Sequence, residues 1–170
     1  MIKVKETEAV LKSYIEFDDY IPINIEFGKW NISIEPTIYW RTGDFNNTLI
    51  EVGVGSEKGI LRSITLILAK HINIIEHNDE LNPNNLMEGI PIIKIEGGLK
   101  NTYTDQKGKL DLLLYNNKIK IVFSNTDVKS CIKSDRVCFG IDENDFISYI
   151  EIVDISEYER NKLLEFFKQF

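Results

Sequence analysis

The sequence holds only two cysteines and four prolines, and it has no apolar stretch long enough to cross a bilayer. A chain of 170 residues buries about 70% of its unfolded surface in one core, so folding requires neither disulfides nor a metal. Charged side chains interrupt residues 1–17, which argues against the apolar core of a secretory signal. We therefore expect one globular domain, residues 1–170, in the cytoplasm.

Basic residues are fewer than acidic ones, with 20 Lys and Arg against 27 Asp and Glu and a net charge of −7. This balance argues against sequence-independent binding to nucleic acid or to an anionic membrane, because both require a positive surface. The same charge favours attraction to a basic partner. Alanine is scarce while Ile, Asn and Lys are abundant, a composition typical of AT-rich bacterial genomes.

The clearest local pattern covers residues 48–69. Apolar side chains alternate on both sides of a glycine-rich turn, which predicts a β-hairpin with one buried face. One possible register pairs Val54 with Ile60, and another pairs Glu51 with Arg62 as a cross-strand ion pair. A slip of one residue exchanges the two faces of a strand, so both registers stay open.

Similar alternation recurs along the chain and predicts further strands. The expected hairpins cover residues 22–35, 110–123 and 136–155, and further strands are expected at residues 37–41 and 90–96. Ile72, Ile74 and Ile75 are expected to extend the strand that ends at Ala69. Asn116 and Asn117 favour a type I′ turn, because both tolerate positive φ. The polar stretches 77–88 and 99–108 predict loops.

A helix is expected at the C-terminus. Ser156 and Glu159 match a capping box, in which each side chain bonds the backbone amide of the other residue. The apolar side of this helix is expected to comprise Tyr158, Leu163, Leu164, Phe166, Phe167 and Phe170. The sequence therefore predicts a mainly β (α+β) fold, an antiparallel, hairpin-rich meander or two-layer sheet with a C-terminal α-helix packed on it.

Two stretches resemble cofactor-binding or metal-binding motifs, but the residues around them do not match what those motifs require. The glycines of residues 53–59 precede a strand, whereas a phosphate-binding loop leads into a helix. Residues 142–145 are acidic, but Ile147 and Val153 stand where a calcium loop requires glycine and glutamate. We expect no cofactor, no metal and no catalytic residues. Paired carboxylates of the glycosidase type need only spatial proximity, so that alternative stays open.

The two cysteines flank a possible turn. If Ser134 and Asp135 form a two-residue turn, Cys131 lies opposite Cys138 on the neighbouring strand. The cytoplasm keeps thiols reduced, and zinc requires about four ligands, with no histidine at a recognised spacing. We therefore expect reduced, structural cysteines.

Two aromatic residues, Tyr39 and Trp40, are adjacent in the sequence. Tyr39 and Trp40 point to opposite faces if residues 37–41 form a strand, so at least one of them faces the surface. An exposed tryptophan beside Arg41 is typical of an interface anchor.

Residues 49–66, LIEVGVGSEKGILRSITL, and residues 137–164, VCFGIDENDFISYIEIVDISEYERNKLL, resemble segments of small uncharacterised Firmicutes-type proteins. Some of those proteins look like immunity proteins of bacterial polymorphic toxin systems. The resemblance implies a non-enzymatic binding role, in which an acidic domain occludes the active site of a toxin. The expected partner is a basic protein, such as a secreted toxin domain, and the expected contact residues are Trp40, Asp44, Asp142, Glu143 and Asp145.

Two other functional classes compete with this interpretation. A small-ligand-binding protein, or an enzyme without a recognised motif, would use the loops around Asn82 and Thr104 as the mouth of a pocket on a β scaffold. A structural or regulatory interaction protein is the third class. An exposed acidic and aromatic patch favours the immunity hypothesis, whereas a deep apolar cavity with converging polar groups favours the pocket hypothesis.

Overall fold

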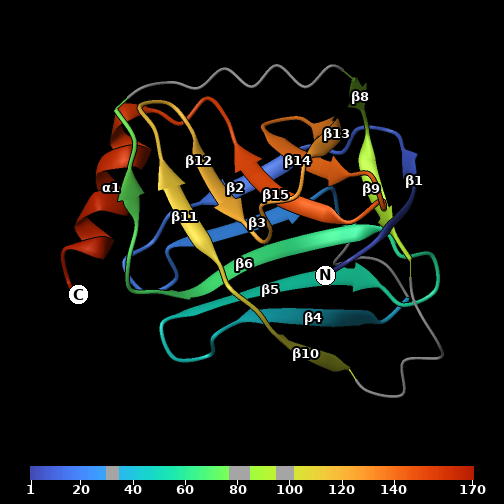
Figure 1. Ribbon diagram of the computed structural model, residues 1–170, viewed down its shortest axis with the longest axis horizontal. Helices are drawn as coiled ribbons and strands as arrows, with labels where there is room; N and C mark the ends of the chain where they lie inside the picture. The colour runs from blue at the N-terminus through green and yellow to red at the C-terminus, as the bar shows by residue number, and fades with distance from the viewer. Residues whose placement is uncertain (30–34, 77–84, 95–101) are drawn as a thin grey trace.

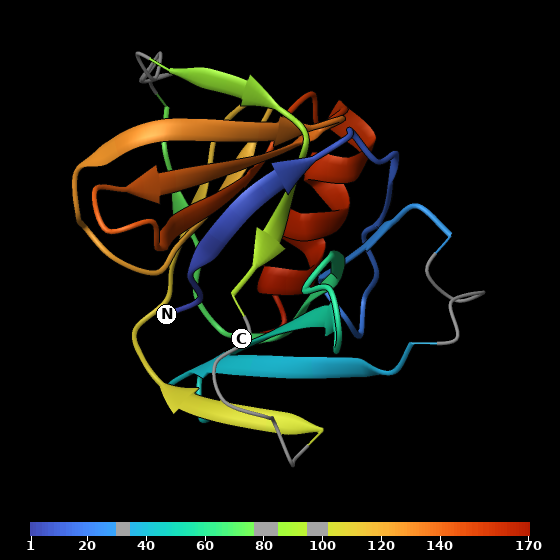
Figure 2. The same cartoon turned by 90° about the vertical axis from the view of Figure 1, so that its right-hand side faces the viewer.

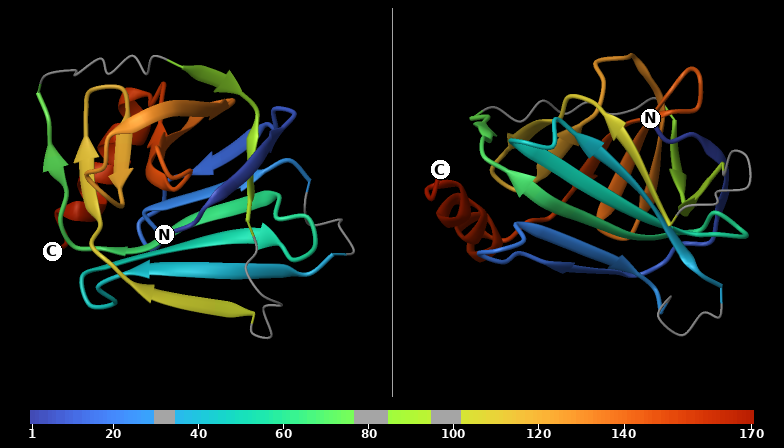
Figure 3. Two further views of the ribbon diagram at one scale, coloured as in Figure 1. Left: turned by 45° about the vertical axis from the view of Figure 1, so that its right-hand side comes forward. Right: turned by 90° about the horizontal axis from the view of Figure 1, so that it is seen from below.

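The computed structural model describes residues 1–29, 35–76, 85–94 and 102–170. These residues form 15 strands and one C-terminal helix, mostly paired antiparallel, which confirms the predicted mainly β (α+β) class (Figure 1). Two large sheets face each other across a common core, and a two-stranded sheet lies beside them (Figure 3).

The first large sheet has six strands. In spatial order they are β10 (Tyr103–Lys107), β4 (Thr37–Gly43), β5 (Thr48–Gly55), β6 (Leu61–Ala69), β3 (Ile23–Phe27) and β2 (Ser13–Glu16). Strand β2 is therefore an edge strand of this sheet.

The second large sheet has seven strands. In spatial order they are β7 (Asn73–Ile74), β11 (Asp111–Leu114), β12 (Ile119–Val122), β15 (Ile147–Ile152), β14 (Val137–Asp142), β13 (Val128–Ser134) and β8 (Leu86–Glu88). The remaining strands, β1 (Val4–Glu8) and β9 (Ile90–Ile93), pair with each other and run side by side in Figure 2.

Alternating side chains of the two large sheets fill the core between them. Ile25 and Ile64 from the first sheet and Ile119 from the second are fully buried. Phe27 and Phe139 meet across the core with their ring centroids 6.1 Å apart. The period-2 pattern seen in the sequence therefore reports which face of each sheet is buried.

The helix α1 (Glu157–Phe167) lies at one end of the two sheets (Figures 1 and 3). Both hydrogen bonds of the predicted capping box between Ser156 and Glu159 are present. Leu163 and Phe166 are buried, but Tyr158 is exposed, so its assignment to the apolar side was wrong. Tyr158 belongs to the first helical turn, whereas the buried positions lie further along the helix. Phe170, also expected on the apolar side, is exposed beyond the helix end.

The hairpin of residues 48–69 is confirmed, but both proposed registers are wrong. Val54 pairs with Leu61 and Glu51 pairs with Thr65. Irregularities between Leu49 and Ile50 and between Gly53 and Val54 shift the pairing. The sequence pattern cannot reveal such bulges, because they insert a residue without changing the composition of the strand.

Three peripheral strands also differ from expectation. Strands β8 and β10 lie in stretches predicted to be loops, and β7 joins the second sheet instead of extending β6. All three pair in parallel with a neighbour distant in sequence. Their side chains are exposed, so no alternation of buried residues marks them in the sequence.

Two turn predictions have different outcomes. Strands β11 and β12 form the expected hairpin, but Asn116 and Asn117 are not among the residues with positive φ, so the type I′ assignment is wrong. In the expected hairpin of residues 22–35, β3 is confirmed and pairs with β2 and β6, while residues 30–34 lie outside the described part of the chain.

Candidate functional site

An acidic and aromatic surface lies where the end of β2 meets the start of α1. We define this edge surface by Glu16, Asp18, Asp19, Tyr20, Glu157 and Tyr158, all of which are exposed. Tyr20 has 88% of its surface exposed and Tyr158 has 69%. An open groove of about 600 Å³ runs between the two elements and is lined by residues of both. Glu16, Asp18 and Tyr158 line this groove, and the exposed Asp19, Tyr20 and Glu157 adjoin them along the chain.

Local contacts hold the β2 side of this surface. The backbone amide of Tyr20 donates to the Asp18 carboxylate at 2.8 Å. The Lys162 ammonium of α1 donates to the carbonyl oxygen of Phe17 at 3.4 Å and lies 5.3 Å from the Tyr158 ring centroid. The end of β2 and the first turns of α1 are thus joined directly.

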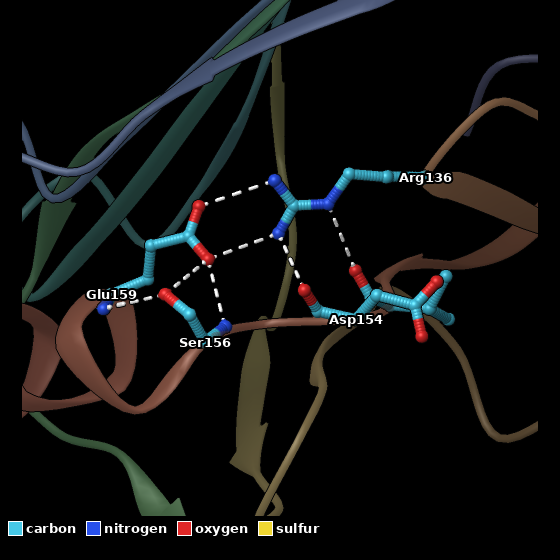
Figure 4. Close-up of polar contacts among 5 residues, drawn as sticks. Arg136, Asp154, Ser156 and Glu159 are labelled. Atoms are coloured by element: carbon cyan, nitrogen blue, oxygen red, sulfur yellow. Dashed lines mark hydrogen bonds and ion pairs between the residues drawn. The ribbon is translucent and has the colours of Figure 1, made fainter.

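The turn between β13 and β14 fixes both sides of the edge surface. The Asp135 carboxylate accepts from the backbone amide of Ser13 at 2.9 Å and from its hydroxyl at 2.7 Å. Its neighbour Arg136 donates twice to the Glu159 carboxylate and once each to the carbonyl oxygens of Val153 and Asp154 (Figure 4). Asp135 adopts a φ of 56°, which directs these two side chains to different elements.

The pKa values of these carboxyl groups follow from their contacts. Burial alone would raise the pKa of Glu159, but hydrogen bonds from Arg136 and Ser156 outweigh it and lower the pKa. Burial would likewise raise the pKa of Asp135, and the two bonds from Ser13 lower it. Both groups are therefore anchored as carboxylates at neutral pH.

Two of the expected contact residues lie on or after β4 and have local partners. Trp40 points into a cavity of about 290 Å³, and its indole nitrogen donates to Gln106 at 3.0 Å. Tyr39 stacks on Tyr103 with ring centroids 5.2 Å apart, and both Tyr39 and Trp40 are half-buried, so neither is the exposed aromatic that the sequence predicted. Asp44 accepts bonds from the amides of Asn46, Asn47 and Thr48, and those from Asn47 most strongly lower its pKa.

The other three expected contact residues occupy the turn between β14 and β15. Asp142 is only 2% exposed, and its carboxylate accepts from the amides of Asn144 and Phe146, each at 2.9 Å. Its place is inside the turn rather than on a contact surface. Glu143 is exposed, and Asp145 is half-exposed and bonded to Lys129 at 2.6 Å. The five residues therefore do not form one continuous patch.

The cysteines are buried and unbridged, but they are not directly opposite each other. Ser134 pairs with Val137, so Cys131 lies opposite Gly140 and Cys138 lies opposite Lys133. The predicted pairing was wrong because the turn residues are Asp135 and Arg136. Cys131 shares a 3.3 Å hydrogen bond with the Tyr149 hydroxyl.

Comparison of the chain with protein-family models finds no match, and comparison with curated proteins finds none either. Within the described ranges, no group of three or more His, Cys, Asp or Glu side chains is placed to hold a metal ion. Among the same residues, no helix has the length and apolar character that spanning a membrane requires. His77 and Asn82, considered in the sequence, lie outside the described part of the chain.

The edge surface was missed by sequence reasoning. One signal was available, since Asp18, Asp19 and Tyr20 are consecutive and precede a proline. Their connection to α1, more than 130 residues later, is made by the bond from Lys162 to Phe17 and by the turn that contains Asp135 and Arg136. No local pattern reports that connection.

Proposed function

We propose that this protein is a non-enzymatic protein-binding domain that neutralises a basic toxin, in the manner of immunity proteins of polymorphic toxin systems. The observation that supports this proposal is the edge surface, where the exposed tyrosines Tyr20 and Tyr158 stand among four carboxylates. In this role the protein acts in the cytoplasm of a bacterium and occludes the active site of its partner.

The two kinds of side chain have different tasks in such an interface. Tyrosines supply large contact area at a low cost in side-chain entropy, and they are enriched among the residues that dominate binding energy. Carboxylates attract a basic partner and accelerate association, an effect that salt weakens. The net charge of −7 extends that attraction beyond the contact itself.

The fixed position of the surface favours tight binding. Because Asp135 and Arg136 hold β2 and α1 together, little order has to be created when the partner binds. Glu143 and Asp145 remain possible contacts at a second location. Variants can separate the two locations.

The test is titration calorimetry against the C-terminal domain of the large protein encoded immediately upstream. We expect tight one-to-one binding that weakens when the salt concentration rises from 50 to about 200 mM. The variants Tyr20→Ala and Asp18→Lys should each weaken binding by about tenfold or more.

Glu143→Lys serves as the matched control, because it reverses one exposed charge away from the edge surface. If Glu143→Lys weakens binding while Tyr20→Ala and Asp18→Lys do not, the contact lies at the β14–β15 turn and the edge surface is rejected. Absence of binding by the unmodified protein would reject the proposed partner class.

A further inference from the structure

The cavity beside Trp40 has the features of a small-ligand site and shares no lining residue with the groove of the edge surface. It lies between β4, β5, β9, β10 and the start of the chain, and its volume is about 290 Å³. This is near the lower end of the range for ligand pockets, about 300–1,000 Å³, so it suits a ligand smaller than most drugs.

Most of the cavity wall is apolar. Its apolar side chains include those of Ile2, Ile38, Trp40, Val52, Val54 and Phe146. The indole of Trp40 is held by an edge-on contact with Phe123, with centroids 5.9 Å apart, and by its hydrogen bond to Gln106. A wall of this kind stabilises an apolar segment of a ligand by removing it from water.

Polar groups converge on one part of the same cavity. The register of β10 against β4 places Thr104 beside Trp40, with Gln106 two residues further along the same face. Two lysines, Lys3 and Lys94, also line the cavity, and the Lys3 ammonium lies 3.9 Å from Asp145 and 5.5 Å from the Phe146 ring centroid. The Lys3 side chain is about one-third exposed, so it can turn toward a ligand at the mouth.

The orientation of the Gln106 amide follows from its partners. An indole N–H can only donate, so the atom 3.0 Å from Trp40 Nε1 is the amide oxygen. The amine of Met1 donates to that same oxygen. Within the part of the chain that the structure describes, the two amide hydrogens of Gln106 have no protein acceptor. The amide therefore presents donors, and so does the Lys3 ammonium.

We propose that this cavity binds a small monocarboxylate with an unbranched apolar tail of medium length. The tail lies against the apolar wall beside Trp40. The carboxylate accepts hydrogen bonds from Gln106, Thr104 and Lys3, and Lys3 then lies between the ligand carboxylate and Asp145. A neutral molecule of the same length would contact the apolar wall but would not form an ion pair with the Lys3 ammonium.

Trp40 supplies a direct readout. The chain has two tryptophans, so Trp30→Phe leaves Trp40 as the sole tryptophan. Fluorescence of this variant is titrated with octanoate and, separately, with octan-1-ol. We expect a saturable one-to-one change with octanoate and binding at least about fivefold weaker with octan-1-ol. The unmodified chain should also gain thermal stability in octanoate, which covers the case in which Trp30→Phe does not fold.

Lys3→Gln tests the charged contact, and Lys5→Gln is its matched control two residues away, outside this cavity. We expect Lys3→Gln to weaken octanoate binding by about tenfold and to leave octan-1-ol unchanged. Lys5→Gln should change neither. The proposal is overturned if octanoate produces no saturable response, if octan-1-ol binds as tightly, or if both lysine variants weaken binding equally.

Discussion

Arg136 and Glu159 join the turn between β13 and β14 to the first turn of α1 through two parallel hydrogen bonds. Arg136 Nη1 lies 3.2 Å from Glu159 Oε1, and Nη2 lies 3.1 Å from Oε2 (Figure 4). Glu159 also completes the capping box with Ser156. One carboxylate thus caps the helix and places it against the sheet.

Replacing this carboxylate should lower the free energy of unfolding. We expect Glu159→Gln to cost about 1–2 kcal/mol at pH 7, a figure reduced for the partial exposure of the pair. Glu157→Gln, in the same helical turn but exposed, is the matched control and should change stability by less than about 0.5 kcal/mol. Urea unfolding of both variants measures the difference. Equal effects would show that the helix dipole, and not Arg136, accounts for the loss.

The same pair predicts how the effect depends on pH. The folded-state pKa of Glu159 is lowered below its ordinary value of 4.5, so its stabilisation is complete above pH 4.5 and is lost as pH falls through the lowered pKa. The stability difference between the wild type and Glu159→Gln should therefore be full at pH 7 and shrink toward pH 2–3. A difference that grows on acidification would contradict this assignment.

Gly140 tests the packing on the outer face of the second sheet. A Cβ at this position would lie 2.2 Å from Tyr149 Cε1, and the Lys120 ammonium lies 3.6 Å from the Tyr149 ring centroid on that face. We expect Gly140→Ala to cost about 1–3 kcal/mol through overpacking. In a Tyr149→Ala background the same change should be neutral or stabilising, because alanine is favoured over glycine within a strand. Additive effects in this double-mutant cycle would refute the steric explanation.

Asp142 and Glu143 are adjacent but should respond differently to truncation. Asp142→Ala removes the acceptor for two backbone amides at a buried position and should cost about 1.5–3 kcal/mol. Glu143→Ala changes an exposed side chain and should stay within about 0.5 kcal/mol. Chemical denaturation at pH 7 compares the two. A neutral Asp142→Ala would show that its two bonds to backbone amides contribute little to stability.

The cysteines should be unreactive in the folded protein. Burial raises the pKa of Cys131, and burial together with the nearby Cys131 raises the pKa of Cys138 to about 12. At pH 8 both thiols are then protonated, and a disulfide reagent should modify neither within minutes, since the thiolate is the nucleophile. After addition of urea, two thiols should react at once. Rapid modification of the native protein would show that the second sheet opens locally at β13 and β14.

Local sequence patterns determined much of this fold. The hairpin of residues 48–69, the strand pair β14 and β15, and the capping box of α1 each depend on neighbours along the chain. Such elements are predictable because alternation and capping are short-range properties. The acidic charge, and with it the expectation of a basic partner, likewise depends on composition alone.

The tertiary structure alone decided how distant elements combine. Bulges set the register of β5 and β6, and the exposed strands β7, β8 and β10 were added in parallel at sheet edges. It also decided which acidic residues are accessible, since Asp142 is buried by its own turn while Asp18 and Asp19 are exposed. The physical reason is that a single side chain such as Asp135 can bond a residue 122 positions away, Ser13, and no local pattern records that contact.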